Sequence, residues 1–152
     1  MSNQKKMRIL KRKFLALFLS LATIFAFTSN AGAAGLDTQT IDLGDNFEVV
    51  IVESVSTQPY ASTISKTKTA SVKYDGTTVG RFSLTGEFAY DGDTAIAIDD
   101  DYSATSYGSW DYKNASSSHS GAKVSGKCTF YKGSTSKTVS LSMTCSPSGQ
   151  IS

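Results

Sequence analysis

Hydrophobic and polar residues alternate along much of the chain after residue 46, and this alternation predicts β-strands. Residues 69–74 place Ala70, Val72 and Tyr74 on one side and Ser71 and Lys73 on the other. Residues 47–55 are rich in β-branched side chains, and their continuous apolar centre predicts a strand covered on both faces. No helical period is visible after residue 34. We therefore expect an all-β antiparallel β-sandwich of about seven to nine short strands.

Turn residues divide this pattern into hairpins. Asp75-Gly76 stands between two alternating runs, which is a strong signal of a tight β-hairpin. The apolar positions change parity at Gly80, and this change predicts a β-bulge there. Asp91-Gly92 predicts the next turn. We expect the acidic run 99–101 to interrupt the strand that follows, and the polar segment 114–121 to be a loop.

The first 33 residues have the organisation of a secretory signal peptide, which would form an N-terminal signal helix. A basic segment is followed by an apolar run at 14–27 and by the small residues Ala31-Gly32-Ala33. The apolar run is shorter than the roughly 20 residues that span a bilayer. The expected organisation is a signal peptide at 1–33 and a single secreted domain at 34–152. That domain would be extracellular, with no membrane attachment after cleavage.

Removal of the signal peptide changes the charge balance. The full chain carries 15 Lys and Arg against 13 Asp and Glu, but six of the basic residues precede residue 14. Residues 34–152 therefore hold 9 basic and 13 acidic side chains, a net charge of −4. A mildly acidic domain offers no overall attraction for nucleic acid or for an anionic membrane. The expected partner is an extracellular protein or a carbohydrate, and the oligomeric state stays open.

Two cysteines in an exported chain suggest a disulfide bond. Cys128 and Cys145 each fall on the apolar side of a predicted strand. A hairpin with its turn near residues 135–138 would place Cys128 opposite Cys145 and Phe130 opposite Met143. We therefore expect a structural Cys128–Cys145 disulfide. The spacing is not the C-x-x-C of a redox motif.

The sequence offers little catalytic chemistry. His119 is the single histidine, and it lies among serines in a segment without a G-x-S-x-G signature. A Ser–His–acid triad would need a serine and an acid brought close by the fold. Two bridged cysteines and one histidine could not form a zinc site. We therefore assign no catalytic residue and expect a protein that is not an enzyme.

An acidic group of residues is the one candidate for a metal site. Carboxylate-rich loops suit Ca²⁺, although the spacing here does not match an EF-hand. The alternative is a set of ordinary acidic turns, and no other cofactor is indicated. The group consists of Asp91, Asp93, Asp99, Asp100 and Asp101.

An aromatic group overlaps the same stretch of chain. Tyr and Trp rings present flat, amphipathic surfaces that could stack on a sugar or anchor a protein partner. The same rings could instead fill the core of the sandwich, Trp110 above all. The expected binding residues are Tyr90, Tyr102, Tyr107, Trp110 and Tyr112.

Three short motifs also carry a resemblance. Residues 86–92 (GEFAYDG), Ser109-Trp110 and residues 141–145 (LSMTC) resemble small secreted β-sandwich proteins of Gram-positive bacteria that lack an assigned function. The resemblance implies a small exported β-sandwich and transfers no site residue. Our leading hypothesis is a secreted, non-enzymatic binding module. The alternatives are a bacteriocin-like or structural extracellular effector and an extracellular hydrolase.

Overall fold

A computed structural model describes residues 37–57 and 62–152 of the chain. These residues form eight antiparallel strands in two sheets and contain no helix, so the predicted all-β class is confirmed. Accordingly, the described part contains no helix able to cross a membrane. The predicted signal peptide and its cleavage site lie outside the described residues.

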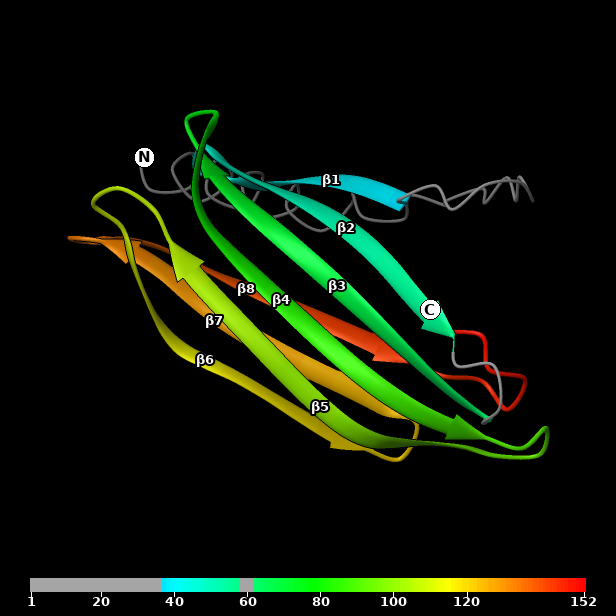
Figure 1. The fold of residues 1–152 in the computed structure, drawn as a ribbon. Coiled ribbons are helices and arrows are strands. Elements are labelled where there is room, and N and C mark those ends of the chain that lie inside the picture. Colours follow the sequence, from blue (N-terminus) through cyan, green and yellow to red (C-terminus); the bar gives the residue numbers. More distant parts are fainter. Residues whose placement is uncertain (1–36, 58–61) are drawn as a thin grey trace, which may run out of the picture. The chain divides into compact units, whose positions relative to one another are not determined.

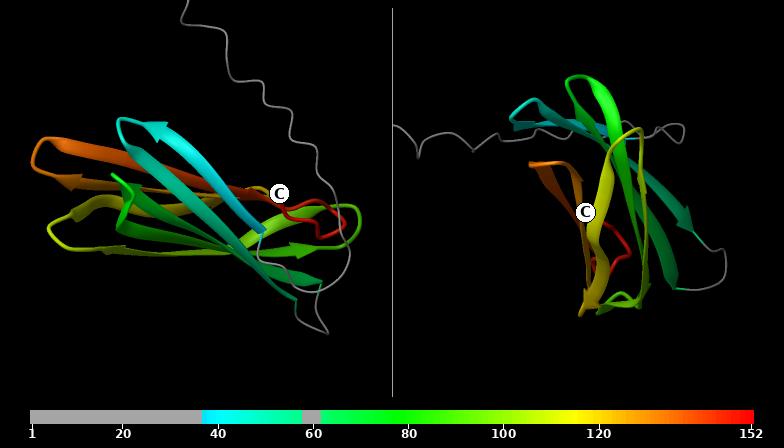
Figure 2. Two further views of the ribbon diagram at one scale, coloured as in Figure 1. Left: turned by 90° about the horizontal axis from the view of Figure 1, so that it is seen from above. Right: turned by 90° about the vertical axis from the view of Figure 1, so that its left-hand side faces the viewer.

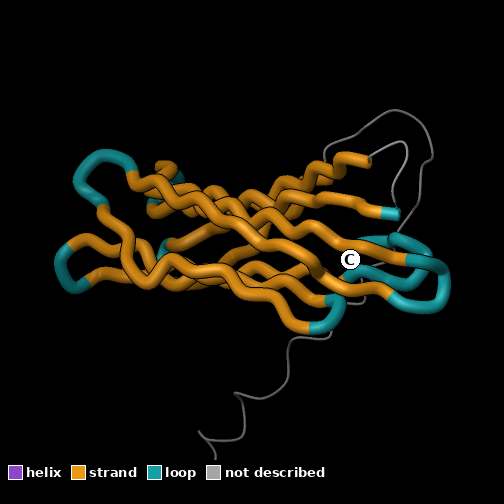
Figure 3. Tube along the Cα trace, turned by 60° about the horizontal axis from the view of Figure 1, so that its bottom comes forward, coloured by secondary structure: helices purple, strands orange, loops and turns teal. Residues whose placement is uncertain are grey.

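The first five strands form one sheet and the last three form another, each in chain order. Where the connection between consecutive strands is described throughout, it is a short loop, and nearly all of the described chain is extended (Figure 3). The first sheet consists of β1 (Asp37–Gly44), β2 (Phe47–Thr57), β3 (Thr63–Tyr74), β4 (Thr77–Tyr90) and β5 (Ala95–Ser106). The second consists of β6 (Asp111–Ser120), β7 (Lys123–Lys132) and β8 (Thr135–Thr144).

The two sheets enclose one hydrophobic core (Figures 1 and 2). Phe82, Leu84 and Phe88 of β4 are fully buried, as are Val124 and Phe130 of β7. The sheets approach closely at glycines, because a Cβ atom on Gly80 would lie 2.1 Å from the Phe130 ring. A Cβ atom on Gly86 would lie 2.9 Å from Val124. The missing side chains therefore make room for the facing sheet.

The predicted hairpin and bulge are both confirmed. Asp75 and Gly76 have φ angles of 48° and 75° in the two-residue loop between β3 and β4. Two positive φ angles in succession are what a type I′ turn requires. Val72 pairs with Gly80 and Lys73 with Thr78, so Val79 is the extra residue of a bulge. This bulge turns both Val79 and Phe82 toward the core.

Several predicted element boundaries are wrong. Strand β1 was not anticipated. The acidic run 99–101 does not interrupt β5 but lies within it, on the strand that forms one edge of the first sheet. The segment 114–121, expected to be a loop, belongs almost entirely to β6 at an edge of the second sheet. A strand at a sheet edge with one solvated face tolerates such polar sequences.

The predicted pairing of β7 with β8 is also wrong. Cys128 pairs with Val139 and Phe130 with Lys137, around a loop at Gly133 and Ser134. Cys145 lies six residues beyond Val139, about 20 Å along the chain at the usual rise of a strand. Disulfide-bonded cysteines have Cα atoms within about 7 Å of each other. Both cysteines are buried and free in the structure, so the expected disulfide is not formed.

An ion-pair cluster closes one end of the first sheet's inner face. Lys66 is only 6% exposed, and its Nζ lies 2.5 Å from a carboxylate oxygen of Glu53. Lys68 forms a second ion pair with Glu53 at 3.0 Å. The Lys66 ammonium also donates a hydrogen bond of 3.1 Å to the Ile151 carbonyl. The cluster thus attaches the C-terminal segment to the sheet.

Candidate functional site

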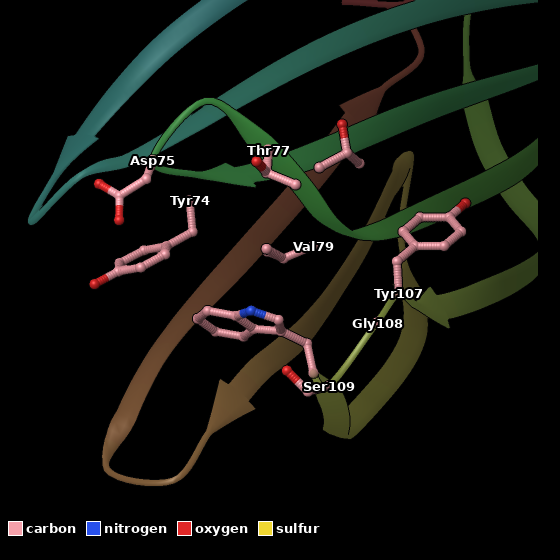
Figure 4. A pocket seen from close by; sticks show the side chains of 9 residues that line it. Tyr74, Asp75, Thr77, Val79, Tyr107, Gly108 and Ser109 are labelled. Atoms are coloured by element: carbon pink, nitrogen blue, oxygen red, sulfur yellow. The ribbon is translucent and has the colours of Figure 1, made fainter.

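A pocket of about 510 Å³ lies where the β3–β4 turn meets the segment between β5 and β6 (Figure 4). Hydrogen bonds fix both walls. The Tyr107 amide donates to the Val79 carbonyl at 2.9 Å, and the Trp110 amide donates to the Tyr107 carbonyl at 3.2 Å. The Asp75 amide donates to the Asn46 carbonyl at 3.0 Å, which fixes the β3–β4 turn against its neighbour. Backbone hydrogen bonds therefore hold both sides of the pocket in place.

Aromatic rings form much of the pocket. Trp110 packs against Tyr74 with ring centroids 5.3 Å apart and meets Phe47 edge to face at 5.8 Å. These rings hold the indole in place, and only 8% of Trp110 remains exposed. Tyr107 is 38% exposed. Tyr74 and Tyr107 lie on opposite sides of the pocket, with Val79 between them (Figure 4).

Four polar residues also line the pocket. Thr77 and Thr78 contribute hydroxyls from β4, and Ser109 contributes one from the facing segment. Asp75 of the turn lies at the edge of the pocket. The pocket therefore combines ring faces for stacking with donors and acceptors for hydrogen bonds. Its volume lies within the usual range of small-molecule sites, about 300–1,000 Å³.

The five predicted aromatic residues do not form one surface. Only Tyr107 and Trp110 line the pocket. Tyr90 is half-buried at the far end of β4, about 40 Å along that strand from the β3–β4 turn. Tyr102 packs near Phe82 with ring centroids 6.3 Å apart, and Tyr112 lies on β6. Tyr102 and Tyr112 are exposed, whereas Trp110 belongs mainly to the core.

The predicted calcium ligands are spread over a turn and a strand. Asp91 accepts hydrogen bonds from the Asp93 and Thr94 amides at 3.0 and 2.7 Å. Those bonds, the Thr94 bond first, lower the pKa of Asp91. Asp99, Asp100 and Asp101 lie in sequence on β5, where side chains alternate between faces. Within residues 37–57 and 62–152, no three acidic, histidine or cysteine side chains are placed to share a metal ion.

His119 does meet an acid, across the junction between the sheets. Its Nδ1 contacts Oδ1 of Asp100 on β5. Hydrogen bonds from Ser117 and then from His119 lower the pKa of Asp100. In a catalytic triad the serine contacts the histidine nitrogen that faces away from the acid. Here the Ser117 hydroxyl instead contacts the acid itself. The three residues therefore form a hydrogen-bonded link between β5 and β6.

The sequence analysis did not identify the side of the pocket that is formed by the β3–β4 turn and the residues beside it. It identified Tyr107 and Trp110 but not Tyr74, Asp75, Thr77 or Thr78. The Asp-Gly turn predicted where this hairpin bends, and Tyr74 immediately precedes that turn. The contact of the turn with residues 107–110 joins segments about 30 residues apart, and no local pattern encodes such a contact.

The comparisons with known proteins give no relative from which a function could be transferred. No family model, curated protein or solved structure matches the chain.

Proposed function

We propose that this domain is an extracellular, non-enzymatic binding module that holds a carbohydrate in the pocket between Tyr74 and Tyr107. The observation that supports this proposal is the composition of the pocket, whose lining combines aromatic residues with two threonines, a serine and an aspartate. Sugar rings present apolar faces bounded by hydroxyl groups. Aromatic side chains can stack on those faces while the polar residues bind the hydroxyls.

The roles follow from position and exposure. Tyr107 is the most accessible of the three rings that line the pocket and would stack on the sugar, whereas buried Trp110 would form the floor. The Asp75 carboxylate in the turn would accept hydrogen bonds from the sugar. The Thr77 hydroxyl, at the start of β4, would donate or accept them. The frame behind them is held by backbone hydrogen bonds, and loops on a rigid sheet are frequent binding sites.

Titration calorimetry with soluble, neutral oligosaccharides tests this proposal. Cello-, chito- and xylo-oligosaccharides are suitable probes, and we expect one of these classes to bind. Tyr107→Ala should weaken that binding by about tenfold, since loss of stacking and of buried area together costs about 1.4 kcal/mol. Tyr112→Ala is the matched control, because Tyr112 has a similar exposure but lies outside the pocket.

Two results would contradict the proposal. One is the absence of binding by all three classes. The other is an equal loss of affinity in the Tyr107→Ala and Tyr112→Ala variants, which would place the sugar elsewhere.

A further inference from the structure

Charge is divided unequally between the two sheets. Residues 37–106 carry 12 acidic and 4 basic side chains, a net charge of −8. Residues 107–152 carry 5 basic residues and a single acid, Asp111, a net charge of +4. The net charge of −4 for the domain is therefore the sum of an acidic first sheet and a cationic second sheet. Charge of one sign gathered on one surface attracts ligands of the opposite sign.

The outer face of β6, β7 and β8 is a hydroxyl-rich cationic surface, which we call the lysine–serine face. Strand alternation and pairing assign 15 positions to it. Ten of these are Ser or Thr, three are Lys, and the others are Asp111 and Tyr131. The basic residues are Lys113, Lys123 and Lys127, all of them exposed.

The three lysines are spaced one after another along the direction of β7, the middle strand of the sheet. Lys123 and Lys127 both lie on β7, about 13 Å apart at the usual strand rise. Lys113 of β6 pairs with Thr129, about 7 Å further along. Lys113 lies over the Tyr131 ring at 4.7 Å, which orients it. No ion pair neutralises these lysines among residues 37–57 and 62–152.

A shallow groove of about 470 Å³ lies within the same face. It is lined by Lys123 and Lys127 and by serines from all three strands, Ser116, Ser118, Ser125, Ser140 and Ser142. The groove therefore places two positive charges among hydroxyl groups that can both donate and accept hydrogen bonds.

We propose that the lysine–serine face binds a linear anionic polysaccharide, with its sulfate, phosphate or carboxylate groups on the lysines and its hydroxyls on the serines. This site is separate from the Tyr74–Tyr107 pocket and does not depend on it. The face contains one large aromatic residue, Tyr131, and that ring is already covered by Lys113. The lysine–serine face therefore lacks the aromatic rings on which single-stranded nucleic acids stack. It also lacks the apolar side chains that insert into membranes. An interface with a second copy would also require an apolar centre.

Binding to dextran sulfate, with uncharged dextran as the reference polymer, tests this proposal. We expect binding to dextran sulfate alone, and we expect it to weaken as salt rises. The double variant Lys123→Gln/Lys127→Gln should lower the slope of log affinity against log salt by about 1.5. The control Arg81→Gln/Lys132→Gln removes the same charge from exposed residues outside the face and should retain the slope. Tyr107→Ala should also bind normally.

Four results would overturn the proposal. They are equal binding to both dextrans, equal effects of the two double variants, tighter binding to single-stranded DNA or phosphatidylglycerol vesicles, and salt-sensitive self-association that the lysine variant abolishes. Urea unfolding of each variant confirms that the altered proteins remain folded.

Discussion

At the scale of single residues, the cysteines show the clearest consequence of strand pairing. Cys128 is fully buried on β7, and burial raises the pKa of its thiol to about 11. Burial also raises the pKa of Cys145, whose thiol donates to the Ser146 carbonyl at 3.4 Å. Both thiols are therefore protonated at neutral pH and behave as small apolar groups in the core.

Thiol counting tests this arrangement. Protein unfolded without reductant should show two free thiols, because the observed pairing keeps the cysteines about 20 Å apart. The folded protein should react slowly, since thiol reagents attack the exposed thiolate. Mass spectrometry after alkylation provides the measurement. A protein without free thiols would mean that β7 and β8 pair differently.

Trp110 illustrates a second residue-scale outcome. Its sequence context allowed either a core or a binding residue. The structure buries most of the indole but leaves it lining the pocket. The two alternatives were not exclusive, because a residue at the end of a sandwich can close the core and also form the floor of a site.

At the scale of elements, Gly80 on β4 is the described glycine at which an added Cβ atom would come nearest to another side chain. Gly80→Ala would force a methyl group into the fully buried Phe130 ring. We expect a loss of about 1–3 kcal/mol in the free energy of unfolding, the usual cost of overpacking. Arg81→Ala, at the exposed neighbouring position, should change it by less than about 0.5 kcal/mol. Equal stabilities in urea denaturation would contradict the close approach.

Glu53 makes the stability of the domain depend on pH in the acidic range. Burial by itself raises the pKa of Glu53, but hydrogen bonds and ion pairs with Lys66 and Lys68 outweigh it and lower the pKa. The unfolded chain therefore binds this proton more readily than the folded protein does. The contribution of Glu53 is present above its ordinary pKa of 4.5 and is lost as the pH falls through the lowered value.

The variant Glu53→Gln tests this dependence. At pH 7 it should be less stable than the original protein, and the difference should shrink as the pH falls below about 4.5. Glu87→Gln removes a carboxylate that has no ion pair within the described part of the chain. It should not reproduce this pattern in urea unfolding measured from pH 7 to pH 3. A pH-independent difference for Glu53→Gln would contradict the ion-pair account.

How far the elements could be predicted depends on the type of signal. The Asp75-Gly76 hairpin and the bulge beside Gly80 have local causes, and both were predicted. The pairing of β7 with β8 has no such marker in the apolar pattern. The predicted and observed partners of Cys128 differ by six residues, and an even shift leaves every side chain on the same face. Only the short loop at Gly133, with its positive φ of 59°, distinguishes the two pairings.

At the scale of the whole domain, the two proposed sites depend on long-range arrangement. The pocket joins the β3–β4 turn to residues 107–110, and the lysine–serine face combines three strands of the second sheet. The net charge of −4 predicts no overall attraction for nucleic acid or for an anionic membrane. That net charge is the sum of a negatively charged first sheet and a positively charged second sheet. The sequence alone does not show which strands belong to which sheet, so it does not show how the charge is divided.

Nuclear magnetic resonance mapping tests the central claim, that the Tyr74–Tyr107 pocket binds a carbohydrate. The ¹⁵N-labelled domain would be titrated with the oligosaccharide class that binds most tightly. Trp110 is the single tryptophan of the chain, so its indole N–H gives one unambiguous signal beside the pocket. We predict saturable shifts of this signal and of the amides at 74–79 and 107–110. Shifts confined to other parts of the domain, with the Trp110 indole unaffected, would contradict the account.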